Sequence, residues 1–486
     1  MTKKNGRKSN NFHPNGLKSK KIKGLQDDLK NLKDLSDPKI IEKIAAKMMS
    51  AQNEVNSEDV TATVERYLNK SVLVNPIEPN DNLHTTVSIP TAQAIGSVAV
   101  VDKPYVYGIV SSLVGPTQFR IINPFNAING QFSSTGKIFC SVVNSMVTQE
   151  DILPFVRAFV FKNPFESNRL FEIYQYKKYQ EKYQYSIIAD IDDYSFEYPE
   201  WHPEHGKFTI ENARTLLINL KTVDQIIVST ETLKEQLIDL GIETPIVVVP
   251  NHLPRSYVTD VRRYRLKDIS KPKILYNGSN YHYGKSNGDL DGIVKDFILK
   301  NLENYEFTFM GIGRRADGSL TLPDYLQEPA KNGLIKITPF YTASEYQVAL
   351  RQLRPDYVLG PLVECPFNEA KSDLRFLEAT ASGALFIGSR FENGKSPYQN
   401  YPFSYGESEG VAKIEEIIET TSNREVFNDY LKSAYDILDK RWIDSTANLL
   451  NYIKIFGDGI RGVQITPEHE QYEDMKNYLD DNGFLR

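Results

Sequence analysis

Cysteine is nearly absent from this sequence of 486 residues, which contains only Cys140 and Cys365. Two cysteines supply neither a disulfide framework nor a metal cluster, and they fit a reducing compartment. No stretch is long and apolar enough to span a bilayer. The basic N-terminus has no apolar segment behind it, so we expect no secretory signal. Together these absences favour a cytoplasmic protein.

A large excess of charge of one sign is missing as well. The formal net charge is -6, which argues against a general nucleic-acid binder. The hydrophobic share of 40% and the charged share of 25% are ordinary for a soluble globular protein. The length suits two or three domains. The many tyrosine, phenylalanine, asparagine and lysine residues are typical of an AT-rich genome, such as that of a phage or a low-GC bacterium.

The first 96 residues differ from the rest of the chain. Residues 1–24 are basic and polar, and this composition predicts a disordered arm. The arm can remain a solvated tail, or it can contact an anionic partner such as nucleic acid, a lipid surface or an acidic protein. Residues 25–96 begin with helical periodicities and continue as a polar connector, so we predict a helical extension here.

Short β-rich runs alternate with helical periodicities over the remaining chain. Strands predicted at residues 224–229 and 245–249 flank a helix at 230–240, an order that implies parallel pairing. The pattern divides the chain into a first domain, a basic linker, a second domain, closing helices and a polar tail, at residues 97–255, 256–271, 272–410, 411–456 and 457–486 respectively. The predicted class is therefore α/β, with parallel strand pairing in two domains.

Acidic residues end one of the predicted buried strands, near residue 191. Asp192 and Asp193 follow its apolar run, and carboxylates at this end of a strand are well placed for ligands in open α/β sheets. Three interpretations remain open. Together with Asp190 they can ligate a divalent metal, they can face an acceptor without a metal, or they can cap the following turn.

A second group of residues has metal-ligand types without metal-ligand spacing. His202, Glu204 and His205 lie in one turn-rich loop, but no third spaced ligand supports a site. We therefore predict no metal centre.

A glycine-rich stretch follows the strand predicted at residues 273–277. It nearly spells a P-loop, but five residues instead of four separate Gly278 from Gly284-Lys285-Ser286. A nucleotide triphosphatase remains an alternative, although no acidic strand completes it. The small residues, free backbone N–H groups and Lys285 suit phosphate binding. His282 lies in the same loop and can face a ligand or the solvent.

The most informative stretch spans residues 365–389. Here a loop precedes a helix that we predict to begin with Ser372 as its N-cap and to end at Gly383, before a short buried strand. Lys371, Ser372 and the backbone N–H groups of the first turn form an anion site.

Glu378 lies farther along this predicted helix. Its carboxylate can accept hydrogen bonds from two sugar hydroxyls, so the helix combines a phosphate site with a sugar site. The alternative is a surface helix that carries an Arg375–Glu378 ion pair.

The stretch contains the following series of residues, before a buried strand: Asn368, Lys371-Ser372, Leu374, Glu378, Ala381 and Gly383. The series resembles the donor-binding motif of GT-B glycosyltransferases of the large retaining, family 4-like group. The resemblance implies two Rossmann-like domains facing a cleft, a nucleotide diphosphate at the helix start and a ribose on Glu378. The family's two glutamates are separated by seven residues. Here Glu369 and Glu378 are separated by eight, and Ala370 occupies the usual place of the first.

The resemblance covers roughly residues 97–455 and implies roles for further loops. The turn that begins at Gly278 would pair Lys285 with the donor diphosphate, while Ser279 stands where the family has an arginine. A second turn that lies in the family's cleft corresponds to Gly311-Ile312-Gly313-Arg314, and the backbone near residues 339–341 would hold the base.

The activity implied is transfer of a sugar from a nucleotide diphosphate, most simply a UDP-sugar, to a hydroxyl acceptor. Retention of configuration and the absence of a metal or other cofactor are implied as well. Candidate catalytic residues are Asp192, Asp193, His282 and Glu369. Possible acceptors are a glycan, a lipid-linked sugar, a protein, or hydroxymethylated bases in DNA, as in phage enzymes. A non-catalytic binding or structural protein on the same fold is the remaining alternative.

Overall fold

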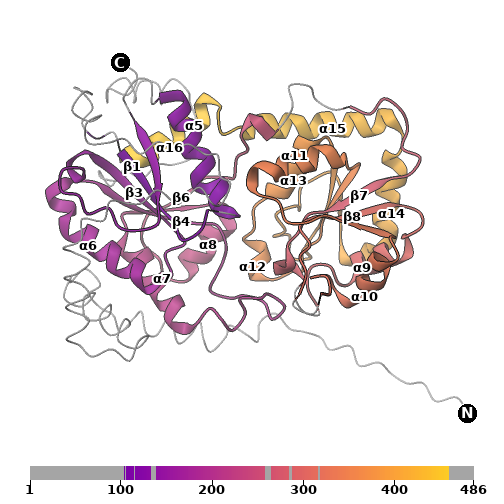
Figure 1. Cartoon of the computed structure of the whole chain (residues 1–486), viewed down its shortest axis with the longest axis horizontal. Helices are drawn as coiled ribbons and strands as arrows, with labels where there is room; N and C mark the ends of the chain where they lie inside the picture. Colours follow the sequence, from indigo (N-terminus) through magenta and orange to yellow (C-terminus); the bar gives the residue numbers. More distant parts are fainter. Residues whose placement is uncertain are drawn as a thin grey trace, which may run out of the picture.

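The computed structural model describes residues 103, 105–113, 115–132, 138–257, 264–283, 287–315 and 318–458. The predicted arm at 1–24, the predicted extension at 25–96, nearly all of the tail at 457–486 and Lys285 lie outside these residues. Within the described part, none of the helices has the length and apolar character needed to cross a bilayer. Figure 1 shows two lobes side by side, the first in purple and magenta and the second mainly in orange.

The first lobe is a parallel sheet of six strands in the order β2-β1-β3-β4-β5-β6. The strands are β1 (Tyr105–Ile109), β2 (Phe139–Val143), β3 (Val156–Lys162), β4 (Ser186–Ile191), β5 (Gln225–Val228) and β6 (Ile246–Val248). The helices are η2 (Gln118–Ile122), α5 (Asn123–Phe132), α6 (Ser167–Tyr183), α7 (Ile210–Thr222) and α8 (Glu231–Asp239), with a short turn η4 (Leu153–Phe155).

The second lobe is also a parallel six-stranded sheet, in the order β12-β11-β10-β7-β8-β9. Its strands are β7 (Lys273–Tyr276), β8 (Glu306–Phe309), β9 (Ile335–Ile337), β10 (Tyr357–Gly360), β11 (Leu385–Ser389) and β12 (Ser404–Tyr405). Read from β9, this order is the 3-2-1-4-5-6 order of a Rossmann sheet. The chain therefore reverses direction across the sheet between β7 and β10.

Helices cover both faces of the second sheet (Figure 1). One face carries α9 (Ile293–Lys300), α10 (Asp324–Lys331) and α14 (Gly410–Thr421), and the other carries α11 (Ala343–Leu353), α13 (Leu374–Ser382) and α15 (Arg424–Leu438). The short helices η5 (Arg255–Tyr257), η6 (Asn280–His282), α12 (Pro366–Glu369), η7 (Glu407–Glu409) and η8 (Asp439–Arg441) lie in connecting segments. The predicted α/β class with two Rossmann-like domains is confirmed.

Local sequence explains where several helices begin. Thr209 caps α7 and Thr342 caps α11, and in each case the third helical residue reaches back to complete a capping box. Asn423 accepts hydrogen bonds from two backbone N–H groups at the start of α15. Such caps satisfy backbone donors that the helix itself leaves unpaired.

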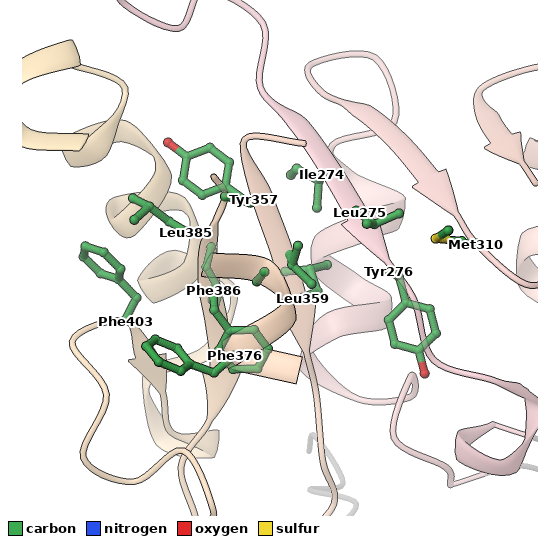
Figure 2. Packing of buried hydrophobic residues seen from close by; sticks show 14 of the residues in the cluster. Ile274, Leu275, Tyr276, Met310, Tyr357, Leu359, Phe376, Leu385, Phe386 and Phe403 are labelled. Atoms are coloured by element: carbon green, nitrogen blue, oxygen red, sulfur yellow. The ribbon is translucent and has the colours of Figure 1, made fainter. Parts of the chain in front are cut away.

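Each sheet has its own buried core. Figure 2 shows the second one, where Tyr276, Tyr357 and Phe386 pack between the sheet and its helices. Gly360 leaves room for the Phe386 ring, because a Cβ at that position would lie 2.1 Å from the ring. The last helix of the described residues, α16 (Thr446–Asp458), packs with α5 on the first sheet, so it lies on the first domain although it follows the second in sequence.

The structure corrects two predictions about the stretch at 365–389. Residues 366–369, predicted as loop, form α12. Ser372 does not cap the following helix: α13 begins at Leu374, and Asp373 precedes it without a side-chain capping bond. The reason is tertiary, because the Ser372 hydroxyl accepts a hydrogen bond from Asn251 of the first domain. Gly383 does end the helix, with φ of 80°.

Candidate functional site

The carboxyl edges of the two sheets face each other, and the segment between β10 and α13 connects them. Ala370 is fully buried and belongs to the apolar core of the first domain. Thr230 donates to the Ala370 carbonyl at 2.9 Å, and Gln236 donates to the Pro366 carbonyl at 2.9 Å. The first domain thus holds the segment that carries the predicted donor motif.

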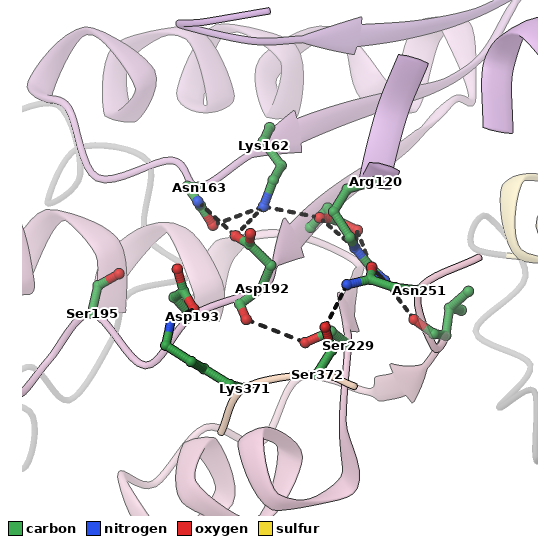
Figure 3. Close-up of polar contacts among 12 residues, drawn as sticks. Arg120, Lys162, Asn163, Asp192, Asp193, Ser195, Ser229, Asn251, Lys371 and Ser372 are labelled. Atoms are coloured by element: carbon green, nitrogen blue, oxygen red, sulfur yellow. Dashed lines mark hydrogen bonds and ion pairs between the residues drawn. The ribbon is translucent and has the colours of Figure 1, made fainter. Parts of the chain in front are cut away.

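The next two residues of this segment, Lys371 and Ser372, each contact a polar side chain of the first domain (Figure 3). Lys371 forms an ion pair with Asp193 at 3.3 Å, and Ser372 accepts from Asn251 at 2.7 Å. The next residue, Asp373, pairs with Arg441 at 2.8 Å. Lys371 also lies 4.3 Å from the centre of the Phe367 ring. The structure therefore brings Lys371 and Ser372 together with Asp193.

A buried ionic network lies next to Asp193 and includes Asn251. Arg120 binds the Asp190 carboxylate through Nε and Nη2 and also reaches Asn251 Oδ1 at 3.1 Å. Lys162 pairs with Asp192 and with Asp190. Cations of the protein thus neutralise Asp190 and Asp192, and no set of three or more potential metal ligands occurs among the described residues.

The two neighbouring aspartates differ in character. Although burial acts in the opposite direction, the Lys162 ammonium lowers the pKa of Asp192. Burial raises the pKa of Asp193, against the opposing charge of Lys371. Asp193 is about one third exposed, with 30% of its side chain accessible, whereas Asp192 has 7%. Of the two, only Asp193 combines access with a raised pKa.

Aromatic side chains from both domains lie close to the Lys371–Asp193 ion pair. His202 stacks on Tyr198 with ring centres 4.5 Å apart and meets Phe367 and Tyr281 of the second domain edge to face. Its Nδ1 accepts a hydrogen bond from the Glu204 backbone N–H. Burial lowers the pKa of His202 to about 3, so the ring is neutral.

His282 is largely buried and not an exposed loop residue. Its Nδ1 lies 2.6 Å from the Asp289 carboxylate, whose other oxygen accepts from the Val363 N–H and from the Asn368 amide, each at 2.8 Å. Burial lowers the pKa of His282 well below its usual value. Asn368, predicted as a donor-binding residue, is thus a link between Asp289 and the α12 segment.

Glu378 is buried on α13 and forms no ion pair with a cation of the described residues. Its Oε2 accepts from the Tyr346 hydroxyl at 3.2 Å, and Tyr346 in turn accepts from Asn277 at 2.8 Å. Burial raises the pKa of Glu378 to about 7, against the opposing effects of Tyr346 and Arg375. The alternative of a surface helix with an Arg375–Glu378 pair is wrong, because seven consecutive residues of α13 are buried and no such pair forms.

The remaining predicted residues make other contacts. Glu369 accepts from Asn393 at 2.8 Å, and Arg314 donates to the Gly318 carbonyl of its own loop at 2.9 Å. Leu374 is partly buried against the second core. Gly278 and Ser279 follow β7.

Gly311 and Gly313 lie after β8, under the ring of Phe340. With 61% of its surface exposed, that ring is available to an incoming planar group.

Sequence reasoning did not identify Asp289, Arg375 or Phe340 as site residues. Asp289 is 79 residues from its partner Asn368, so no local motif indicates the contact. Phe340 lies within the backbone stretch at residues 339–341 that was predicted to hold the base, and its exposed ring over Gly311 and Gly313 is what adds its side chain to the site.

No family model matches the sequence, and no curated protein does either. The fold is similar to that of sucrose-phosphate synthase from Thermosynechococcus elongatus, with 11% identity, a TM-score of 0.47, and coverage of 74% of this chain and 100% of that one. TarM of S. aureus has 12% identity and a TM-score of 0.42, over 62% of this chain; the chain spans about half, 54%, of TarM. A putative UDP-N-acetylglucosamine 2-epimerase from Listeria monocytogenes has 13% identity and a TM-score of 0.43, with coverage of 73% and 97%.

Proposed function

We propose that this protein is a GT-B glycosyltransferase that transfers a sugar from a nucleotide diphosphate, most simply a UDP-sugar, to a hydroxyl acceptor. The observation that carries the proposal is Glu378, a buried carboxylate without a cationic partner among the described residues. Burying an unpaired carboxylate is costly, and a ribose diol would supply two hydroxyl donors to it. Tyr346 holds the carboxylate in place.

The donor diphosphate binds near Lys371 and Ser372 at the start of α13. A lysine ammonium and the positive end of the helix dipole stabilise the charge that develops on the leaving diphosphate. The base lies over Phe340, beside the backbone of residues 339–341. No metal or cofactor enters the mechanism.

Asp193 is the candidate that meets the acceptor hydroxyl. Without a donor, its partner is Lys371 at 3.3 Å. When the diphosphate binds the Lys371 ammonium, Asp193 loses its counter-charge. This loss raises the affinity of the Asp193 carboxylate for a proton. Donor binding thereby prepares the carboxylate to accept the acceptor's proton. The reaction class leaves open whether that acceptor is a glycan, a lipid-linked sugar, a protein or modified DNA.

A screen of nucleotide sugars by thermal shift tests the proposal. We expect one class of nucleotide sugar to raise the melting temperature of the wild type. The shift should disappear in Glu378→Ala and Lys371→Ala, because these variants lose the ribose and diphosphate contacts. The matched control is Lys413→Ala, which removes a surface lysine paired with Glu416. If no nucleotide sugar produces a shift, or if the shift persists in both site variants, the proposal fails.

Asp193→Asn tests the assigned role of the carboxylate. Sugar transfer should fall by about 10²-fold or more, the usual contribution of a general base. Nucleotide affinity, measured by calorimetry, should stay equal or increase, because Lys371 no longer pairs with an aspartate. Asp436→Asn on the exposed side of α15 is the control. Retained transfer, or a parallel loss of nucleotide affinity, would contradict the role.

A further inference from the structure

The first turn of α13 places Arg375 at the carboxyl end of β7. Its guanidinium carbon lies 5.7 Å from the centre of the Tyr276 ring, at the last residue of that strand. β7 and β10 are neighbours, and the segments that follow them lead to helices on opposite faces of the sheet. Ligands of open α/β sheets bind at such a reversal point. Arg375 therefore stands where this fold binds ligands.

The acidic side chains near Arg375 act on it only at a distance: Asp289 raises its pKa, and the charge of Arg375 opposes the raised pKa of Glu378. Arg375 forms no ion pair with any carboxylate of the described residues, and its Nη1 is buried without a hydrogen-bond partner there. The two nearest carboxylates in the network are engaged elsewhere, Glu378 by Tyr346 and Asp289 by His282 and Asn368. A partly buried guanidinium with one nitrogen that lacks a hydrogen-bond partner favours an anion beside it.

The phenols around Arg375 add hydrogen-bond donors and no negative charge. Burial keeps the pKa of Tyr276 and Tyr283 well above the usual value, so both phenols retain their protons. The Tyr283 hydroxyl is likewise buried without a partner in the described part of the chain. Lys371 and Arg375 both lie at the positive end of the α13 dipole, where cations are disfavoured. All of these features favour an anion.

Gly278 leaves the space that this arrangement needs. A Cβ at position 278 would lie 2.2 Å from the Tyr276 hydroxyl oxygen and 2.8 Å from Arg375 Nη2. No side chain fits without moving both groups. The backbone of the turn after β7 can therefore approach the guanidinium closely, as phosphate-binding turns do.

We propose that Arg375 is the arginine that binds the donor diphosphate, supplied by α13 in place of the loop arginine where Ser279 stands. The inference rests on the proposed function and assigns its phosphate contact. A guanidinium binds phosphate oxygens through two parallel hydrogen bonds, which a lysine ammonium does not. Arg375 thus fixes the orientation of the diphosphate, and Lys371 adds a second positive charge.

Calorimetric titration of the full chain with UDP and with uridine tests the inference. Arg375→Met should weaken UDP binding by about 10–100-fold, the effect of losing hydrogen bonds to a charged group, and leave uridine binding unchanged. Arg375→Lys should weaken UDP binding less than the methionine variant does. Arg424→Met, which removes an arginine from the exposed start of α15, should bind UDP like the wild type.

The melting temperature without ligand separates binding from a structural role. Because the cation is unpaired, Arg375→Met should melt no lower than the wild type. Unchanged UDP affinity, or a lower melting temperature with equal losses for UDP and uridine, overturns the inference.

Titration with inorganic pyrophosphate separates this inference from the proposed function. If the wild type binds pyrophosphate through Arg375 but no nucleotide, the proposed function fails while the anion site stands. If it binds neither, both fail.

Discussion

Replacing Arg120 by methionine is expected to lower the free energy of unfolding by about 3–5 kcal/mol, because it leaves a buried carboxylate without its main partner. Arg120 is 2% exposed and binds Asp190 through two nitrogens, at 2.8 and 3.1 Å. It also donates to the Val249 carbonyl at 2.5 Å. Lys162 remains 3.2 Å from Asp190, but its shortest contact is to Asp192.

Urea unfolding at neutral pH, followed by circular dichroism, measures this loss. The matched control is Arg390→Met, which removes a half-exposed pair with Glu409 and should cost less than about 1 kcal/mol. The double variant Arg120→Met, Asp190→Leu should be more stable than Arg120→Met alone, since it removes the stranded carboxylate as well. A single variant within about 1 kcal/mol of the wild type would contradict the assigned role of the pair.

The strand pattern could be predicted from the sequence because parallel strands are buried on both faces. The apolar run before Asp192 is β4, all six residues of which are buried, and it pairs with β3 and β5. Helix starts were predictable where the cap is local, as at Thr342. The prediction of Ser372 as an N-cap was wrong because its hydroxyl has a partner 121 residues earlier in the chain. Local helix-capping propensity does not predict a contact between residues so far apart in sequence.

The same distinction applies to the candidate site. Lys371 and Glu378 belong to one continuous motif, so the sequence places them together. The sequence indicated Arg375 only as the partner of Glu378 in the alternative of a surface helix, because residues three apart on a helix often pair. In the fold, Arg375 turns towards the β7 turn and Glu378 towards Tyr346 on α11.

Glu378→Gln is expected to make the protein more stable above neutral pH and to weaken the binding of the proposed donor. Burial raises the pKa of Glu378 to about 7, from an ordinary value of 4.5. The unfolded chain therefore releases this proton at lower pH than the folded protein does. The contribution of the carboxyl to stability is complete below pH 4.5 and is lost as the pH rises through 7. The difference in pKa corresponds to about 3 kcal/mol, which glutamine, having no proton to release, retains.

Thermal and urea unfolding of both proteins at pH 5 and pH 8 tests this expectation. The variant should gain up to about 3 kcal/mol over the wild type at pH 8 and much less at pH 5. Glu416→Gln on the surface of α14 should stay within about 0.5 kcal/mol of the wild type at both values. Equal stability of Glu378→Gln and the wild type at pH 8 would show that the carboxylate is not strained.

Nucleotide binding should change in the opposite direction, because the charged carboxylate is the better acceptor for the ribose hydroxyls. In the wild type the affinity should rise with pH through about 7, as Glu378 loses its proton. In Glu378→Gln it should be lower by about tenfold or more at pH 8 and nearly independent of pH. Selection for ligand binding retains buried groups that lower folding stability. The opposite signs of the two effects therefore separate a binding role for Glu378 from a structural one.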